Sequence, residues 1–526
     1  MRSLLRRSIL AAILLASVTH AEAATRGGTL VFARNADSLF LDPVLNDDNV
    51  DIWVLTSLHS TLILPTPDTK GLRPGLATSW TASEDGKTLT LKLRAGAKFS
   101  DGSPVTADDV VWSLNRARDP KAGIWNFLLA SVDAVSAPAP DTVVLALKHP
   151  DLSLPAALAT FNAAILPSKL FEAQPGKTDE EKARAFADHP VGAGPFVLAS
   201  WQRGTQMVLK RNPYYWQKDE TGESLPYLDE VDLKVVTDDA TRVLQLQAGQ
   251  IDAAEFVPYA RVKELQGNAS LSMALFPSTK VDYIQMNVRP KLLDGTPNPL
   301  SDEKVRQALN FAVNKRAVIQ IVTHGLGTPM HSYMASTTPL YHDVGEAYPF
   351  DAKKAKQLLT EAGYGSGFNL TVLAQAGNAD QAALLAAVQQ MWTPLGVKLS
   401  IQQMDIATLD DRYHKNDFQL RAGYWTNDIA DPNEITSYFA YYPTNECQQS
   451  GWKSDRATAL FEQSQVEQDA AKRADDYKEL QQLYMGAAPI LFLYQTPFAA
   501  AALKKVKGFY QLPLGNDVFE TTYIEK

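Results

Sequence analysis

Segments with the periodicity of strands alternate with segments of helical periodicity along almost the whole chain. Apolar and polar residues alternate over 88–93, over 231–235 and again over 281–286, as they do in half-buried strands. Because this alternation recurs throughout, we predict an α/β fold with mixed sheets. With 526 residues, the chain is long enough for two or three domains with full hydrophobic cores.

The predicted helices have recognisable starts and stops. Residues 106–109, Thr-Ala-Asp-Asp, have the form of a capping box ahead of an apolar stripe. A helix is expected to open at Ser301, with acidic residues in its first turn, and to stop at Gly325. Further helices are predicted over 351–363 and 381–392, and a strand over 397–401 follows the second of them.

The first 23 residues have the three parts of a secretory signal peptide. Three arginines within the first seven residues form a basic start, Ile9 to Val18 is apolar, and Ala21-Glu22-Ala23 is a small-x-small cleavage site. The apolar run is far shorter than the roughly 20 residues that a transmembrane helix needs. We predict cleavage after Ala23 and a periplasmic location. Because the signal region has no cysteine, we expect no lipid anchor.

The net charge and the cysteine content limit the kinds of function that this chain can have. Removal of residues 1–23 takes away three arginines and Glu22, which changes the net charge from -9 to -11. This dispersed acidic balance argues against binding to nucleic acid or to anionic membranes. The single cysteine, Cys447, cannot form an internal disulfide, so the cores must stabilise the exported protein, and we expect Cys447 to be buried.

No catalytic constellation can be recognised in the sequence. The chain has no G-x-S-x-G elbow, no P-loop and no H-E-x-x-H motif. Gly363–Gly367 is glycine-rich but ends a predicted helix, so it is interpreted as a turn. His324 and His331 flank a Gly/Pro-rich turn, where surface or packing roles are favoured over metal ligation. We therefore predict a non-catalytic protein with no cofactor and no metal site, although missing motifs do not exclude an enzyme.

Several separated segments resemble the family 5 extracytoplasmic solute-binding proteins, the dipeptide, oligopeptide and nickel-binding group that serves ABC importers. The most specific segment runs from Leu76 to Val110 and contains Trp80, the strand over 88–93, the turn Lys98–Gly102 and the capping box. Further segments follow in the family's order: Gly192–Phe196, Arg211–Trp216, Gln247–Asp252, Lys304–Leu309, Gly325–Pro329 and Pro489–Tyr494. The resemblance covers essentially the whole chain after residue 23.

The resemblance implies a two-lobed fold of the type II periplasmic-binding-protein kind. Two α/β lobes with mixed sheets are joined by a hinge and close on a solute between them, and lobe I carries an extra subdomain. The implied organisation is signal peptide 1–23, lobe I 24–60, extra subdomain 61–185, lobe I 186–277, lobe II 278–490 and a return to lobe I over 491–526. The segment around Lys98–Gly102 would lie in the extra subdomain and have a structural role.

The segment expected to contact the solute is 423–432, which resembles the family's W-x-x-D-x-x-D-P segment. In the peptide-binding members the first aspartate of that segment pairs with the α-ammonium of the peptide, and Asp428 occupies this position here. A desolvated carboxylate facing an ammonium makes a strong charge-assisted contact. Trp425 would provide a stacking wall, with Tyr424 and Asn427 beside Asp428 as further contacts.

Structural roles compete with these assignments. Trp425 could equally belong to a core, and Asp431-Pro432 is favoured as a turn and helix start. On lobe I, Asp37 and Ser38 follow the opening strand and are candidates for contact with the solute, whereas the acidic run 47–51 is expected to cap a helix.

The predicted function is that of the periplasmic solute-binding component of an ABC importer, which captures a peptide or peptide-like amine solute by lobe closure. An opine, an oligosaccharide or a metal chelate remains open as the solute. An exported peptidase or a chemosensory receptor is the alternative of a different class. The expected partners are the small solute and the permease subunits of the inner membrane, and the expected state is a monomer.

Overall fold

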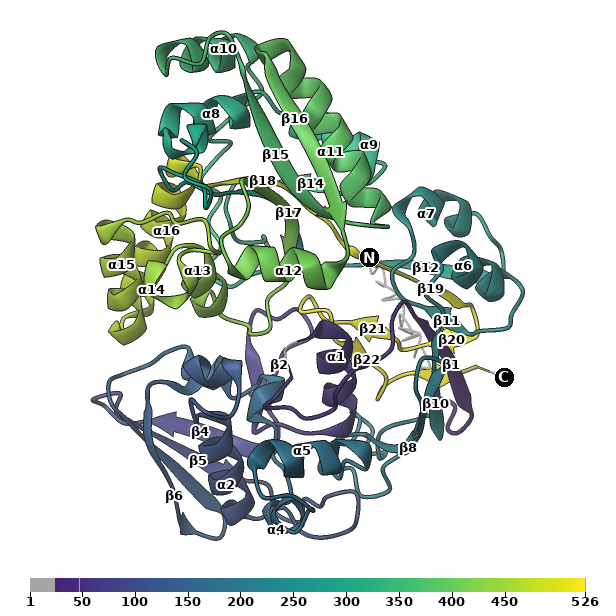
Figure 1. Ribbon diagram of the computed structural model, residues 1–526. Helices are drawn as coiled ribbons and strands as arrows, with labels where there is room; N and C mark the ends of the chain where they lie inside the picture. The colour runs from purple at the N-terminus through teal and green to yellow at the C-terminus, as the bar shows by residue number, and fades with distance from the viewer. Residues whose placement is uncertain (1–23, 47, 526) are drawn as a thin grey trace, which may run out of the picture.

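Two mixed β-sheets form the centres of two lobes (Figure 1). The computed structural model describes residues 24–46 and 48–525, so the predicted signal peptide lies outside the described residues. We name the lobe with the larger sheet lobe I and the other, in the upper part of Figure 1, lobe II. The α/β class and the mixed sheets predicted from periodicity are confirmed.

Within the described residues, the lobe I sheet has seven strands in the order β12 (Leu271–Phe276), β19 (Phe498–Leu503), β11 (Ala253–Ala254), β1 (Thr29–Arg34), β10 (Glu230–Val235), β9 (Gln206–Arg211) and β8 (Phe196–Gln202). Strand β1 runs parallel to both of its neighbours, whereas the outer pairs are antiparallel. The predicted alternation is present in β10, where Val231 and Leu233 are buried and the intervening side chains are partly exposed.

The lobe II sheet has six strands in the described chain, in the order β14 (Thr328–Pro329), β18 (Ile490–Gln495), β13 (Val281–Met286), β17 (Leu420–Trp425), β15 (Phe368–Gln375) and β16 (Val397–Met404). Strand β15 pairs in parallel with β16 and β17, and β13 pairs antiparallel with β17 and β18. Strand β17 matters most for function, because its carboxyl end leads into the segment expected to contact the solute.

The chain crosses between the lobes twice, once between β12 and β13 and once between β18 and β19. The crossings lie side by side, since Gln495 Nε2 donates to the Ser278 carbonyl at 2.8 Å and the Ser278 hydroxyl donates to the Thr496 carbonyl. Two adjacent extended crossings suit a hinge. The predicted return at 491 is too early, because residues 490–495 form β18 and pair with β13 in lobe II. The other lobe boundaries stay predictions.

A separate antiparallel sheet lies at the lower left of Figure 1, with the order β4 (Ala77–Ala82), β5 (Thr88–Leu93), β7 (Thr142–Leu147) and β6 (Val132–Ala139). Helix α2 (Ala107–Ala117) packs on it and starts with the predicted capping box, in which Thr106 and Asp109 bond reciprocally. The segment with the strongest family resemblance therefore forms this small sheet and its helix.

The remaining helices are α1 (Asn49–Leu58), α3 (Leu154–Ala157), α4 (Ser168–Glu172), α5 (Asp179–Asp188), α6 (Asp239–Gln247), α7 (Tyr259–Gln266), α8 (Glu303–Phe311), α9 (Lys315–Val322), α10 (Ala352–Glu361), α11 (Ala379–Trp392), α12 (Ile406–His414), α13 (Asn433–Phe439), α14 (Tyr442–Asn445), α15 (Asp455–Val466) and α16 (Ala470–Ala487). The single helix predicted from Ser301 to Gly325 is wrong. Asp302 caps α8, and Asn314 starts α9 by accepting a hydrogen bond from the Ala317 amide at 3.0 Å.

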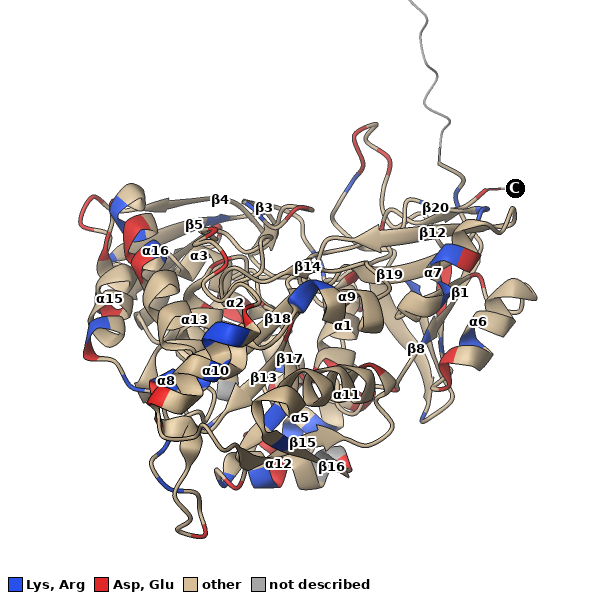
Figure 2. Cartoon of the chain, turned by 90° about the horizontal axis from the view of Figure 1, so that it is seen from above, with Lys and Arg blue, Asp and Glu red and all other residues tan. Residues whose placement is uncertain are grey.

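Short strand pairs complete the fold: β2 (Ile63–Pro65) with β3 (Leu72–Pro74), β20 (Val506–Lys507) with β23 (Tyr523–Ile524), and β21 (Tyr510–Gln511) with β22 (Asp517–Val518). Cys447 is buried, as predicted. Acidic and basic residues are interspersed over both lobes (Figure 2). Among the described helices, none has the length and apolar character that crossing a membrane would require.

Candidate functional site

A cavity of about 500 Å³ lies between the two lobes. Its lobe I wall is formed by the start of α1, with Asp48, Asn49 and Ile52, and by Trp125. Its lobe II wall consists of Gln375, Gln381, Leu409, Asp410, Arg421 to Thr426, Asp428 and Tyr438. Whole small-molecule sites have volumes of roughly 300–1,000 Å³, so this interlobe cavity has the size of a complete site.

The lobes touch at the edges of the interlobe cavity. Asn49 Nδ2 in lobe I donates to Thr426 Oγ1 in lobe II at 3.1 Å. The rings of Phe127 and Tyr438 meet edge to face with centroids 5.7 Å apart. These contacts join α1 and the extra sheet region to the segment that follows β17, so the cavity is bounded on both sides by protein.

Aromatic side chains form part of the cavity wall. Trp425 lies 4.8 Å from Tyr438 between ring centroids and also packs edge to face against the buried Phe439, at 5.6 Å. Tyr424 is 49 % exposed and lines the same space. Trp425 therefore belongs to the lobe II core on one side and presents a surface for stacking on the other.

Asp428 is paired with a second carboxyl group, that of Glu434. Helix α13 begins directly after Asp431-Pro432, and this turn brings Glu434 Oε2 back to accept the backbone amides of Asp428 and Ile429 at 2.8 and 3.1 Å. Glu434 is completely buried, and no donor among the described residues bonds its Oε1.

Burial is the main cause that raises the pKa of both carboxyl groups, and the charge of Asp428 raises the pKa of Glu434 further. Two adjacent acids in a poorly solvated place cannot both ionise, so the pair shares a proton. No Lys or Arg of the described chain forms an ion pair with Asp428. The Asp428–Glu434 pair thus presents an acidic group to the cavity without a protein cation to balance it.

The loop that carries Asp428 is fixed to α16 by a buried ion pair. Arg473 Nη1 and Nη2 donate to the two carboxylate oxygens of Asp431 at 2.9 and 2.8 Å. The side chains are only 7 % and 10 % exposed. Asp431 also accepts a hydrogen bond from the Asn433 amide at 2.8 Å, as expected for a turn and helix start. Its ion pair with Arg473 additionally fixes the segment between Asp428 and α13 to α16.

The structure brings three predicted residues, Asp428, Trp425 and Tyr424, to the interlobe cavity. Asn427 does not line it. Asn427 is fully buried, its backbone amide donates to Thr279 Oγ1 at 2.9 Å, and its side-chain amide donates to Thr338 Oγ1 at 3.2 Å. Its polar atoms therefore hold the loop against the crossing segment between the lobes, and we revise the prediction that Asn427 contacts the solute.

Asp37 and Ser38 also lie away from the cavity lining. Asp37 accepts hydrogen bonds from Trp201 Nε1 at 3.1 Å and from the Gly204 amide at 2.6 Å. Ser38 is 2 % exposed, and its hydroxyl donates to the Val50 carbonyl at 3.0 Å. Both side chains stabilise the loop after β1, so this part of the site prediction is corrected.

Arg421 is the basic residue among the cavity residues that the sequence did not reveal. It is the one Lys or Arg among the described residues that line the interlobe cavity. One guanidinium nitrogen lies 3.4 Å from Asp410 Oδ1, the group stacks over the Tyr413 ring at 4.4 Å, and Nε has no hydrogen-bond partner. Within a strand, Arg421 carries no local signal of function, because only the tertiary fold places it beside the cavity.

Comparisons with known proteins agree with this architecture. The profile of the bacterial extracellular solute-binding proteins, family 5 Middle, matches residues 71–446. The chain is 28 % identical to the probable D,D-dipeptide-binding periplasmic protein DdpA of Escherichia coli (strain K12), over 99 % of both chains. It is 30 % identical to the glutathione-binding protein GsiB of Salmonella paratyphi A, over 96 % of both.

The fold is similar to that of the periplasmic binding protein DppA of Helicobacter pylori in complex with the peptide STSA. The TM-score is 0.82 at 25 % identity, and the match covers 95 % of this chain and 99 % of DppA. The similarity therefore includes both lobes and the space between them.

Proposed function

Because the chain belongs to the bacterial extracellular solute-binding proteins of family 5, we propose that it captures a peptide or peptide-like amine solute between its lobes and delivers it to the permease of an ABC importer. Members of this family bind solutes and are not enzymes, in keeping with the predicted absence of catalysis. The periplasmic relatives, together with the signal peptide predicted over 1–23, support a periplasmic location.

The observation that carries the proposal is the Asp428–Glu434 pair in the interlobe cavity. A carboxylate removed from water is costly unless an opposite charge accompanies it. An ammonium group of the solute supplies that charge together with hydrogen-bond donors, and it forms the charge-assisted contact that Asp428 lacks within the protein. Trp425 and Tyr424 then cover the apolar part of the solute.

Lobe closure follows from the same arrangement. Asp428 and the aromatic wall belong to lobe II, whereas Asn49 and Ile52 belong to lobe I. A solute that contacts both walls binds the closed state more tightly than the open one and shifts the population toward it. The closed state is then the form that a permease would recognise.

A thermal-shift panel tests the need for an amine. Free di- and tripeptides are expected to raise the melting temperature, because a ligand that binds only the folded state at a hundredfold excess over its Kd stabilises by about 2.7 kcal/mol. The same peptides with N-acetyl groups are the matched controls and should give no shift, since acetylation removes the ammonium. Equal shifts from both forms, or shifts only from opines, oligosaccharides or metal chelates, would overturn the proposal.

The affinity for a free peptide is expected to depend on pH through the acid pair. Burial raises the pKa of Asp428, and an ammonium ligand favours its ionised form. Affinity should therefore fall as the pH drops below this raised pKa, by up to tenfold per unit, and level off above it.

Glu434→Gln is the matched variant for this pH dependence. Glutamine keeps an oxygen for the two backbone amides and offers a permanent N–H donor to Asp428, so Asp428 stays ionised to lower pH. Calorimetric titration between about pH 5 and pH 8 should show the fall in affinity at lower pH in the variant than in the wild type. Identical profiles would mean that Glu434 does not control the ionisation of Asp428.

A further inference from the structure

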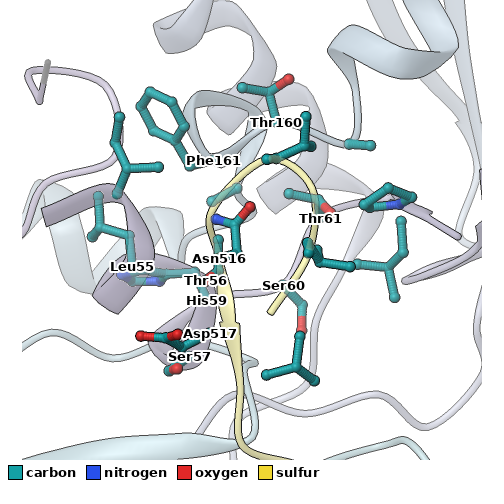
Figure 3. Close-up of a pocket in the computed structure, with 18 of the residues that line it drawn as sticks. Leu55, Thr56, Ser57, His59, Ser60, Thr61, Thr160, Phe161, Asn516 and Asp517 are labelled. Atoms are coloured by element: carbon teal, nitrogen blue, oxygen red, sulfur yellow. The ribbon is translucent and has the colours of Figure 1, made fainter. Parts of the chain in front are cut away.

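A second, smaller chamber of about 100 Å³ lies inside lobe I, beside the interlobe cavity (Figure 3). Ile52 and Asp428 line both spaces, so the two meet at these residues. Figure 3 shows around the chamber the side chains of Thr160 and Phe161, of Asn516 and Asp517 in the C-terminal segment, and of Leu55, Thr56, Ser57, His59, Ser60 and Thr61. Its volume is below the roughly 300–1,000 Å³ of a complete ligand site, so it has room for part of a solute.

Asp517 is the acidic group of this chamber that has an unsatisfied oxygen within the described residues. It is 6 % exposed and lines the chamber, and its Oδ1 accepts no hydrogen bond from the part of the chain that the structure describes. Burial raises the pKa of Asp517, and the negative charge of Glu255 raises it further. Glu255 is 1 % exposed, and no donor of the described chain bonds its Oε2. Because an ionised carboxylate can only accept hydrogen bonds, Asp517 Oδ1 requires a donor from outside the described protein, and the adjacent acid Glu255 favours a donor that carries a positive charge.

The charges around the chamber do not balance. Its carboxyl groups and their buried partners are Asp428, Glu434, Glu255, Asp517 and Glu520, and the guanidinium groups whose charges act on them are Arg34, Arg73 and Arg242. Arg34 lies 3.7 Å from Glu255, and the charge of Arg73 acts on Glu520. The charge of Arg34 also acts on Asp517, and Arg242 acts on Glu255 while it pairs with Asp239 at 2.6 Å. Among the described residues, no Lys or Arg forms an ion pair with Asp517 or Asp428.

His59 does not supply the missing charge. It lines the chamber at 5 % exposure, and burial lowers the pKa of its imidazole to about 4, so the ring is neutral at pH 7. Both ring nitrogens lack a hydrogen-bond partner in the described protein. The chamber therefore joins apolar walls, such as Leu55 and Phe161, to an acidic end, which is the environment that suits an aliphatic stem with a cationic tip.

We propose that the chamber is a subsite for a basic side chain on the first residue of the bound peptide. With the α-ammonium at Asp428, that side chain passes Ile52, and its cation pairs with the unsatisfied carboxylate oxygen of Asp517. The inference rests on the proposed function and adds a substrate class, namely peptides that begin with a lysine-, ornithine- or arginine-like residue.

The test compares two tripeptides, lysyl-alanyl-alanine and norleucyl-alanyl-alanine, whose first side chains share a four-carbon stem and differ in the terminal ammonium. Calorimetry at pH 7 is expected to give at least about tenfold tighter binding of the lysyl peptide, because a charge-assisted bond to a buried carboxylate is added. In Asp517→Asn the ratio of the two affinities should fall to near one. Asp294→Asn, on an exposed turn, is the matched control and should keep the wild-type ratio.

Each outcome has a defined meaning. Equal wild-type affinities for the two tripeptides, or a preference that survives in Asp517→Asn, would overturn the subsite while leaving the proposed function intact. If neither tripeptide binds at millimolar concentration, the proposed function fails and the subsite fails with it. A thermal unfolding curve of Asp517→Asn that matches the wild type shows that a lost preference comes from the site and not from unfolding.

Discussion

Replacing Asp428 with asparagine is expected to lower the affinity for a free tripeptide by about 2–5 kcal/mol, which is roughly thirtyfold to several thousandfold. The asparagine keeps the size of the side chain but cannot balance a buried ammonium. Loss of one partner of a desolvated charge pair leaves the other charge uncompensated, and this accounts for most of the penalty. The same change removes the like-charge repulsion between position 428 and the buried Glu434, so we expect no loss of folding stability.

Calorimetric titration of lysyl-alanyl-alanine into wild type and Asp428→Asn measures this effect. Asp294→Asn, which changes an exposed turn carboxylate outside both cavity linings, is the control and should bind as the wild type does. Retention of affinity within about threefold in Asp428→Asn would remove Asp428 from the site. A melting temperature at or above that of the wild type would show that the lost binding is local.

Replacing Arg473 with methionine is expected to lower the free energy of unfolding by about 3–5 kcal/mol, because it leaves the carboxylate of Asp431 buried without its bidentate partner. Methionine fills most of the volume of the arginine side chain, so the loss of stability reflects the unpaired carboxylate of Asp431 more than an empty cavity. Peptide affinity should fall as well, since the ion pair fixes the loop that carries Asp428 to α16.

Chemical denaturation of wild type, Arg473→Met and the double variant Arg473→Met/Asp431→Asn checks this prediction. The double variant removes the unpaired charge and should recover a large part of the lost stability. If Arg473→Met is as stable as the wild type, the ion pair does not hold the loop. If the double variant is no more stable than the single one, the penalty comes from packing.

The sequence predicted the local elements of the fold well wherever a short pattern determines them. Thr106 and Asp109 form their capping box because both partners lie within one helical turn. The break between α8 and α9 escaped prediction because the apolar stripe continues across it through Ala312 and Val313, which pack in the same lobe II core as both helices. Only the hydrogen bond of Asn314 shows that a new helix starts there.

The candidate site was predictable only in the one segment where its residues are consecutive. Tyr424, Trp425 and Asp428 follow one another along β17 and its loop, so a resemblance in that segment was enough to place them. Asp37 and Ser38 lie outside the cavity lining because their side chains bond backbone groups that the fold of lobe I brings to them, namely the Gly204 amide and the Val50 carbonyl.

The rest of the site depends on contacts between distant parts of the chain. The interlobe cavity takes residues from α1, from Trp125 and from strands of lobe II, and no spacing in the sequence connects them. Glu255 and Asp517 come from the two separate parts of the chain that build lobe I, so no local pattern in the sequence brings their carboxyl groups together.

The central claim is that the protein holds an amine-bearing solute between its lobes, and native mass spectrometry of the protein as purified from the periplasm tests it most directly. We predict a bound peptide or peptide-like mass on the wild type, with a free amino group shown by reaction of the released solute with an amine reagent, and no such mass on Asp428→Asn. A bound solute without an amino group, or the same solute retained equally by Asp428→Asn, would contradict the account.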